Sequence, residues 1–177
     1  PVVAIIGGAN VTDKVQAMKN LIAYGKVDRL IFVGGIAFPF LKAQGYDVDN
    51  CMFEEDQDSR SQALYSATVV LELAKGYGVD LILPVDHLMA KPTGLNPENV
   101  KVNKIKGRFS RLKAYDIGPG TLALIEKKMW DAKTILFNGI AGKYEDEMFC
   151  HGTNRILDLV FACEAESKII LGLHSVT

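Results

Sequence analysis

The sequence predicts an α/β protein in which a parallel sheet is covered by helices on both faces. Three observations predict this class. Short, continuous apolar runs, such as residues 2–6 and 30–33, are typical of strands buried on both faces. These two runs end in pairs of glycines, and segments with helical spacing follow them. Strands that alternate with helices along a chain form a parallel sheet with helices packed against it.

Length and composition are those of a globular chain. Its 177 residues, 49% hydrophobic and 23% charged, are enough for one domain with a real core, which we assign to residues 1–177. The net charge of -1 gives no reason to expect nucleic acid or an anionic membrane as a partner. No apolar run reaches the length of a membrane span, so we expect a cytoplasmic protein. Because Pro1 directly precedes a strand, with no initiator Met, we expect this chain to be part of something longer or a processed product.

The cysteines and histidines are scattered along the chain. Cys51, Cys150 and Cys163 show no paired spacing, which predicts reduced thiols rather than a zinc site or a disulfide framework. The three histidines also lack the spacing of metal ligands. We therefore expect no metal site built from these side chains.

The first strand, residues 2–6, leads into Gly7-Gly8 and a helix whose apolar positions include Val15 and Met18. Glycine lets a ligand approach the main chain, and a helix start attracts anions such as phosphate. Lys14 could add a positive charge one turn in. A tight turn without a ligand explains the same pattern, and the spacing matches neither a Walker A loop nor a dinucleotide fingerprint.

A second unit of the same kind follows, with a strand at residues 30–33, Gly34-Gly35 and a helical segment at 36–42. Parallel strands place such turns along one edge of a sheet, where ligands bind. Close packing of strand against helix is the alternative explanation for these two glycines.

The middle of the chain is expected to hold one long helix and one strand. Ser59 is a plausible N-cap for a helix that runs to about Tyr77, where nearby glycines end it. Residues 81–86 are read as a third strand, with Pro84 near its end. Residues 91–113 are read as a loop with an exposed hairpin, whose basic side chains suit either an anion patch or a solvated edge strand.

The last third repeats the alternation. Residues 116–121 carry a helix-start signal, with proline near the first turn, and this helix runs to about Trp130. A fourth strand at 134–137 ends at Asn138-Gly139, and Gly152 opens another helix. A fifth strand at 168–171 is followed by Gly172.

Several segments together resemble the phosphoglycerate kinase family. Residues 7–14 resemble its GGAKVxDK segment, and residues 36–42 resemble the end of its GGMAFTFLK segment. The segments at 83–86, 116–119, 138–145 and 152–153 follow in the family's order. The resemblance covers the whole chain and identifies it as similar to the C-terminal, nucleotide-binding half of that enzyme, a three-layer, Rossmann-like α/β domain.

The resemblance implies reversible phosphoryl transfer between 1,3-bisphosphoglycerate and Mg-ADP, with the acyl substrate held by a separate N-terminal domain. It implies ADP or ATP with Mg²⁺ as ligands and the rest of a longer chain, or a larger assembly, as partner. Lys14 would be the catalytic residue at the transferring phosphate. Glu145 would accept the ribose hydroxyls, although the general pattern alone favours a solvated loop acid. The nucleotide would lie against Gly8, Ala9, Asn10, Lys14, Gly34, Gly35, Asn138, Gly139, Gly142, Glu145 and Gly172.

The chain departs from the family pattern at important positions. Asn10 replaces the lysine of GGAK, and Ser175 replaces the aspartate of the GGGDT loop. Val33 takes the place of the first glycine of the second loop, and Ile140 that of the proline after Asn-Gly. Phosphoryl transfer depends on positive charge around the moving group, which an amide cannot supply.

These departures leave three hypotheses open. The chain is a catalytically impaired, phosphoglycerate kinase-like module that binds nucleotide weakly, which the charge losses favour. Alternatively it is a fragment of an active phosphoglycerate kinase, or a structural domain that has lost its ligand.

Overall fold

The computed structural model describes residues 1–51, 54–93, 96–105, 107 and 111–172. Its main feature is a five-stranded sheet in which every pair of neighbours is parallel, with the order β3-β2-β1-β7-β8. β1 lies at the centre, and its Ile5 is aligned with Ile31 of β2 and Phe137 of β7. The five strands of this sheet correspond to the five expected from the sequence, except that the one expected at 81–86 ends at Ile82. They are β1 (Val2–Ile6), β2 (Arg29–Phe32), β3 (Asp80–Ile82), β7 (Thr134–Asn138) and β8 (Ser167–Leu171).

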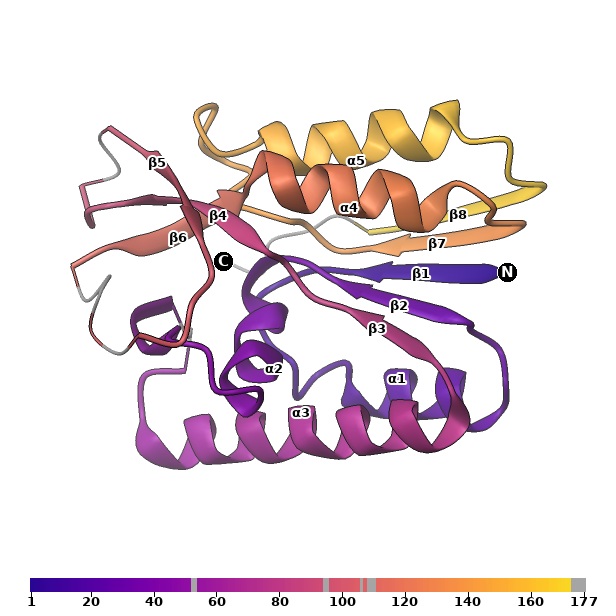
Figure 1. Cartoon of the computed structure of the whole chain (residues 1–177), viewed down its shortest axis with the longest axis horizontal. Coiled ribbons are helices and arrows are strands. Elements are labelled where there is room, and N and C mark those ends of the chain that lie inside the picture. The colour runs from indigo at the N-terminus through magenta and orange to yellow at the C-terminus, as the bar shows by residue number, and fades with distance from the viewer. Residues whose placement is uncertain (52–53, 94–95, 106, 108–110, 173–177) are drawn as a thin grey trace.

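Helices cover both faces of this sheet, as predicted (Figure 1). One face carries α1 (Val15–Ala23), α2 (Ala37–Ala43) and α3 (Gln57–Tyr77), and the other carries α4 (Pro119–Met129) and α5 (His151–Ala162). Alternate residues of β1 explain the arrangement, because Val3 and Ile5 pack in the cluster that includes α4 and α5, whereas Ala4 and Ile6 pack in the cluster that includes α1, α2 and α3. Two 3-10 helices, η1 (Gly34–Ile36) and η2 (Asp49–Cys51), flank α2.

A second sheet lies at the carboxyl edge of the first (Figure 1). It is antiparallel, with the order β5-β4-β6, and consists of β4 (Asp86–Ala90), β5 (Glu98–Lys101) and β6 (Lys113–Ile117). The single strand predicted at 81–86 is therefore wrong. It is divided at the buried Pro84, which lies between β3 and β4.

The predicted loop with an exposed hairpin at 91–113 is also wrong in its main feature. Its residues 98–101 form β5, and Lys113 begins β6; both strands pair with β4 rather than with each other. Val100 is buried together with Phe38 and Met89. This small core is what makes the second sheet part of the molecule rather than a solvated hairpin.

Helix ends follow local chemistry, with one correction. Asp56, not Ser59, is the N-cap of α3, and its carboxylate accepts a hydrogen bond from the Ser59 backbone N–H at 2.8 Å. Gly78 ends α3 in the left-handed conformation, with φ of 70°. Pro119 lies at the start of α4, as expected.

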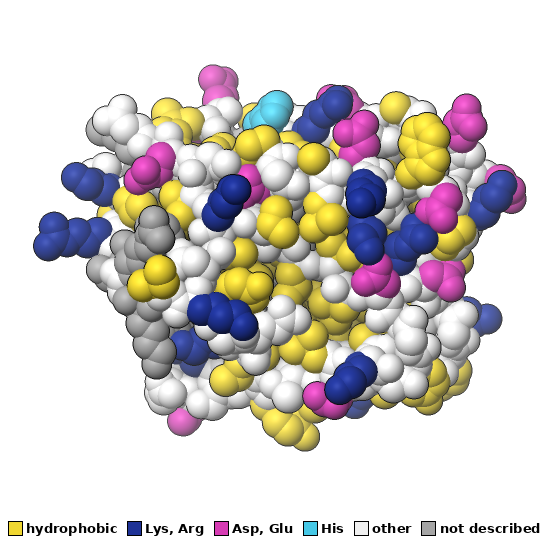
Figure 2. Space-filling model, in the orientation of Figure 1, with side chains coloured by type: hydrophobic (Ala, Val, Ile, Leu, Met, Phe, Trp, Pro, Cys, Tyr) yellow, Lys and Arg dark blue, Asp and Glu magenta, His cyan; other side chains and the backbone are white. Residues whose placement is uncertain are grey.

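The molecular surface drawn in Figure 2 has a hydrophobic middle. Hydrophobic side chains gather along the centre of this face, and basic and acidic side chains are mixed toward the right edge of the view. Ion pairs of the described residues include Arg29 with Asp131 and Lys128 with Asp80. Among the helices that the structure describes, none has both the length and the apolar character needed to cross a membrane.

Candidate functional site

Three strand-end loops meet in direct backbone contact at the carboxyl edge of the main sheet. Gly34, after β2, has φ of 68°, and a Cβ there would lie 2.6 Å from the Ile140 carbonyl oxygen. Gly139, after β7, has φ of 101°, and a Cβ there would lie 2.3 Å from the Gly7 carbonyl oxygen. Glycine is required at both positions by conformation and by space. Gly34 therefore serves close packing between loops, here against the loop after β7 rather than between strand and helix.

The backbone N–H groups of the first glycine turn are already used within the protein. Gly7 donates to the Asn138 carbonyl at 2.7 Å, and Gly8 donates to the Ile140 carbonyl at 3.0 Å. In addition, α1 begins only at Val15, so the turn does not open the helix directly. The expectation that this turn presents free helix-start N–H groups to an anion does not hold at Gly7 and Gly8.

Lys14 places a cation at this edge of the sheet. Its Nζ donates to the Gly7 carbonyl at 2.7 Å and to Asn138 Oδ1 at 3.2 Å, which directs the ammonium group to the ends of β1 and β7. Burial lowers the pKa of Lys14, and the nearby Asp13 carboxylate opposes this shift. The ammonium group has three protons, so two protein bonds leave one available.

A cleft of about 950 Å³ opens above these loops. Its lining includes residues 8–10 of the loop after β1, Gly34 and Gly35 after β2, and residues 140–143 of the loop after β7. The wall belongs to the second sheet, through His87 of β4 and the start of β6. The volume is in the range of small-molecule sites, which are typically a few hundred to a thousand Å³.

Two buried aspartates attach this wall to the helices of the main layer. Asp86 of β4 accepts hydrogen bonds from the N–H groups of Gly120 and Thr121 at the start of α4, at 2.9 and 2.7 Å. Asp116 of β6 accepts one from the Gly152 N–H at the start of α5, at 2.7 Å. A carboxylate at a helix N-terminus satisfies N–H groups and interacts favourably with the helix dipole.

The two carboxyl groups titrate differently. Burial raises the pKa of Asp86, but the hydrogen bonds from Thr121 and Gly120 outweigh it, and the pKa is lowered overall. Burial raises the pKa of Asp116 to about 6, against the opposing backbone hydrogen bonds from Gly152 and Ile117. Asp116 lines the cleft, so its charge changes within the site near neutral pH.

The structure brings together most of the residues predicted for the site. Glu145 lines the cleft from an exposed loop after β7. Asn138 and Gly139 lie beneath the lining, in contact with Lys14 and Gly7 respectively. Gly172 follows β8 and is not among the described residues that line the cleft. The predicted residues in the lining are Gly8, Ala9, Asn10, Lys14, Gly34, Gly35, Gly142 and Glu145.

The sequence model of the family described as phosphoglycerate kinase matches residues 1–177, the whole chain. The chain belongs to the phosphoglycerate kinase family. The phosphoglycerate kinase of Campylobacter hominis is 37% identical over 174 residues, which cover 97% of this chain and 40% of the relative. That of Clostridium perfringens is 39% identical over 172 residues, covering 97% and 40%. The chain thus spans about two fifths of the length of the curated relatives it matches.

Solved structures of the family share the fold. The phosphoglycerate kinase of Coxiella burnetii is 36% identical, with a TM-score of 0.81 over 96% of this chain and 41% of that one. The enzyme of Pyrococcus horikoshii OT3 is 21% identical, with a TM-score of 0.76 over 93% and 40%. The predicted α/β class and the resemblance to the family are both confirmed.

The departures from the family motifs have different local consequences. Asn10 is exposed at the cleft, and its Oδ1 accepts a hydrogen bond from the Thr12 N–H at 2.8 Å, so the side chain holds its own loop. Val33 is fully buried, and its N–H donates to the Ile6 carbonyl. Ser175 lies outside the described residues, as do the positions on either side of it.

Sequence reasoning missed the wall of the cleft. The lining also includes residues of α2 and the second sheet that were not predicted for the site, although Phe38 and Asp116 lie in segments that resemble the family: Phe38, His87, Lys113, Ala114, Tyr115 and Asp116. One signal was available, because residues 113–117 directly precede the helix-start signal at Gly118-Pro119, as the end of a strand would. The Tyr115 ring stacks on Phe149, with centroids 4.8 Å apart, which fixes this part of the wall.

Proposed function

We propose that this cleft binds ADP or ATP with Mg²⁺, as the nucleotide-binding half of a phosphoglycerate kinase-like protein. The observation that carries the proposal is Lys14, whose ammonium group is held by the Gly7 carbonyl and Asn138 at the strand ends inside a cleft of suitable size. A lysine held in this way acts as a point charge for phosphate.

The nucleotide would lie across the carboxyl ends of the strands. Its phosphates would meet Lys14, with Gly8, Ala9 and Asn10 beside them and Asn138-Gly139 beneath. Glu145 would accept the ribose hydroxyls from its exposed loop. The base would lie in the less polar part of the cleft, near Gly34-Gly35. Gly142 would lie close to the sugar, and Gly172 would belong to the edge of the site.

Magnesium would enter with the nucleotide as part of the substrate. Mg²⁺ is usually held by phosphate oxygens and one or two carboxylates. Asp13 suits this role, because it lines the cleft and lies near enough to Lys14 to influence its pKa. The bound ion would neutralise phosphate charge, while Lys14 and the loops position the phosphates.

We further propose that the 177-residue chain forms one domain and is catalytically impaired. In the family reaction, a phosphoryl group moves reversibly from 1,3-bisphosphoglycerate to Mg-ADP. Asn10 brings no charge to the moving group and is engaged with its own loop. Loss of one charge-stabilising contact commonly costs about 3 kcal/mol of the barrier. In the family the acyl substrate is held by a separate N-terminal domain, so a polypeptide of these residues alone also lacks the proximity contribution, roughly 7–11 kcal/mol, and should give no detectable turnover.

The first test is binding. Calorimetric titration of the chain with Mg-ADP up to millimolar concentration should give heat and a rise in Tm. Lys14→Met should weaken binding roughly tenfold to a hundredfold, since hydrogen bonds to charged groups contribute about 1.5–3 kcal/mol. Lys26→Met, at an exposed position away from the cleft lining, is the matched control and should change nothing. No heat and no Tm shift would favour the structural-domain hypothesis.

The second test is turnover. The chain is joined to the remainder of the Campylobacter hominis relative, and phosphoryl transfer to ADP is measured before and after Asn10→Lys and Ser175→Asp. Turnover that appears only after these substitutions supports impairment. Normal turnover in the unrestored fusion would contradict impairment and support the alternative, a fragment of an active phosphoglycerate kinase.

A further inference from the structure

An arginine in the first turn of α3 lines the cleft with most of its donors unused. Arg60 is half-buried, and its Nε donates to the Glu54 backbone carbonyl at 2.7 Å. Among the described residues, its guanidinium group has no further hydrogen bond and no ion pair. A guanidinium group has five N–H donors, so the four on its two Nη atoms remain available. Such a fork of donors suits a ligand that presents two acceptors side by side.

Arg60 lies beyond the part of the cleft that holds Lys14. Lys14 is fixed at the ends of β1 and β7, whereas the first turn of α3 extends past the carboxyl edge of the main sheet, to the level of the second sheet (Figure 1). Phe38 of α2 and Cys51 of η2 also belong to the lining. A ligand whose phosphates meet Lys14 can therefore direct its other end toward Arg60.

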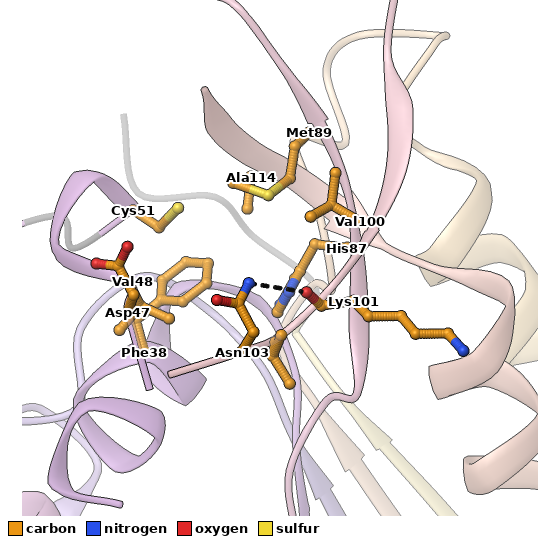
Figure 3. A pocket seen from close by; sticks show the side chains of 11 residues that line it. Phe38, Asp47, Val48, Cys51, His87, Met89, Val100, Lys101, Asn103 and Ala114 are labelled. Atoms are coloured by element: carbon orange, nitrogen blue, oxygen red, sulfur yellow. Dashed lines mark hydrogen bonds between the residues drawn. The ribbon is translucent and has the colours of Figure 1, made fainter. Parts of the chain in front are cut away.

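The cleft is closed behind Phe38 and Cys51. These two side chains also line a small cavity with a volume of about 20 Å³, which is drawn in Figure 3. That volume holds one water molecule and nothing larger. A nucleobase cannot enter the small cavity, so the start of α3 is a polar boundary that a base in this part of the cleft can meet.

Two carboxylates accompany Arg60 in the lining, those of Glu54 and Glu55. Their charges oppose a second phosphate at this place, but they accept hydrogen bonds from N–H groups. Guanine presents O6 and N7 as adjacent acceptors, which match the arginine fork, and its N1–H and 2-amino group are donors that carboxylates accept. Adenine presents an amino donor where guanine has O6, so the fork would meet one acceptor and one donor. This combination of side chains therefore favours guanine over adenine.

We propose that Arg60 recognises the base of the nucleotide, and that the cleft binds a guanine nucleotide, Mg-GDP or Mg-GTP, more tightly than the adenine nucleotide. This inference rests on the proposed nucleotide binding and specifies the base. Lys14 contacts phosphates that both nucleotides share, so ADP binds as well, but without the paired hydrogen bonds to Arg60. Glu54 and Glu55 accept the N–H donors of guanine.

Calorimetric titration compares Mg-GDP with Mg-ADP. The wild type should bind Mg-GDP roughly 5-fold to 150-fold more tightly, which is the discrimination typical of a bidentate arginine–guanine pair. Arg60→Met keeps the length of the side chain without its donors and should bind the two nucleotides with similar affinity. Arg60→Lys keeps the charge but not the fork, so it should also lose most of the preference. Arg155→Met, exposed on α5 and outside the described lining, is the matched control and should keep the wild-type preference.

A modified base gives an independent readout. The nucleotide 7-deaza-GDP lacks the N7 acceptor and cannot form the bidentate pair. The wild type should bind it at least about fivefold more weakly than GDP, whereas Arg60→Met should bind the two equally well. Inorganic tripolyphosphate has no base and should bind the wild type and Arg60→Met with similar affinity.

The possible outcomes are distinguishable. If the wild type binds neither Mg-GDP nor Mg-ADP, the proposed function fails and this inference with it. If the wild type binds the two nucleotides equally well, or if Arg60→Met keeps the preference for GDP, nucleotide binding stands and the role of Arg60 is overturned. An equal loss of affinity for GDP, ADP and tripolyphosphate in Arg60→Met would place the guanidinium group at the phosphates and would also overturn base recognition. If Arg60→Met does not fold, Arg60→Lys and 7-deaza-GDP decide the question in the same way.

Discussion

Asp86 should be one of the most sensitive positions for stability, although it lies apart from the phosphate end of the cleft. Its carboxylate accepts hydrogen bonds from the Gly120 N–H, the Thr121 N–H and the Thr121 hydroxyl, at 2.9, 2.7 and 2.7 Å. Asp86→Asn removes the charge and places an amide donor against these donors. Hydrogen bonds to charged groups contribute about 1.5–3 kcal/mol each, and asparagine retains an acceptor, so we expect a loss of about 3 kcal/mol.

The assay is thermal and urea unfolding at pH 7, followed by circular dichroism. For a chain of this size, about 1 kcal/mol corresponds to roughly 2–4 °C, so the Tm should fall by about 6–12 °C. The control is Asp131→Asn at the exposed ion pair with Arg29, which should leave the Tm nearly unchanged. A Tm for Asp86→Asn within about 2 °C of the wild type would refute the view that this carboxylate holds the wall to α4.

The pH dependence of this difference has a defined sign. The pKa of Asp86 is lower in the folded state than its ordinary value of 3.8. The stabilisation by the charged form is therefore fully present above that value and is lost as the pH falls through the folded pKa. The gap between wild type and Asp86→Asn should be constant from pH 5 to 7 and should shrink below about pH 4.

Two further predictions concern the loops and the second aspartate. Gly34→Ala should cost more than about 2 kcal/mol in urea unfolding, because it adds a clash with the Ile140 carbonyl to the strain of a positive φ. Gly45→Ala, at φ of 86° with open space around it, should cost only the strain, about 1 kcal/mol. Equal costs for the two substitutions would contradict the contact between the loops. Asp116 has a folded pKa of about 6, above its ordinary value of 3.8, so its contribution to stability is present below about pH 4 and is lost as the pH rises through 6. Between pH 4 and 7 the wild type should lose roughly 3 kcal/mol relative to Asp116→Asn, and parallel pH profiles in chemical unfolding would rule this out.

The sequence predicted the main sheet well for a physical reason. Strands buried on both faces must be apolar throughout, and the runs around Ile5, Ile31 and Phe137 show this plainly. The second sheet lacked such a signal. β5 is mostly exposed, and β4 begins with two buried polar residues. Pro84 was assigned to a strand at 81–86, but it lies between β3 and β4.

The candidate site was predicted in part for a related reason. Glycine pairs after strands indicate where loops meet, and Lys14 was found from its place in such a motif. The wall was not predictable because Phe38, His87 and Tyr115 come from three elements that no local pattern connects. The motif also could not reveal that Gly34 and Gly139 are needed for contact between loops, since packing and ligand access require the same residue.

The attachment of the second sheet has a mechanical consequence. Asp86 begins β4 and Asp116 lies near the end of the neighbouring strand β6, and each accepts a hydrogen bond from the first turn of a different helix on the same face of the main sheet. The wall therefore cannot tilt without stretching hydrogen bonds that water does not reach to replace. The stiffness of the wall derives from the helix layer rather than from its own three short strands. The hydrogen bonds from the start of α4 to Asp86 lie outside the lining of the cleft, and they keep the cleft at its width.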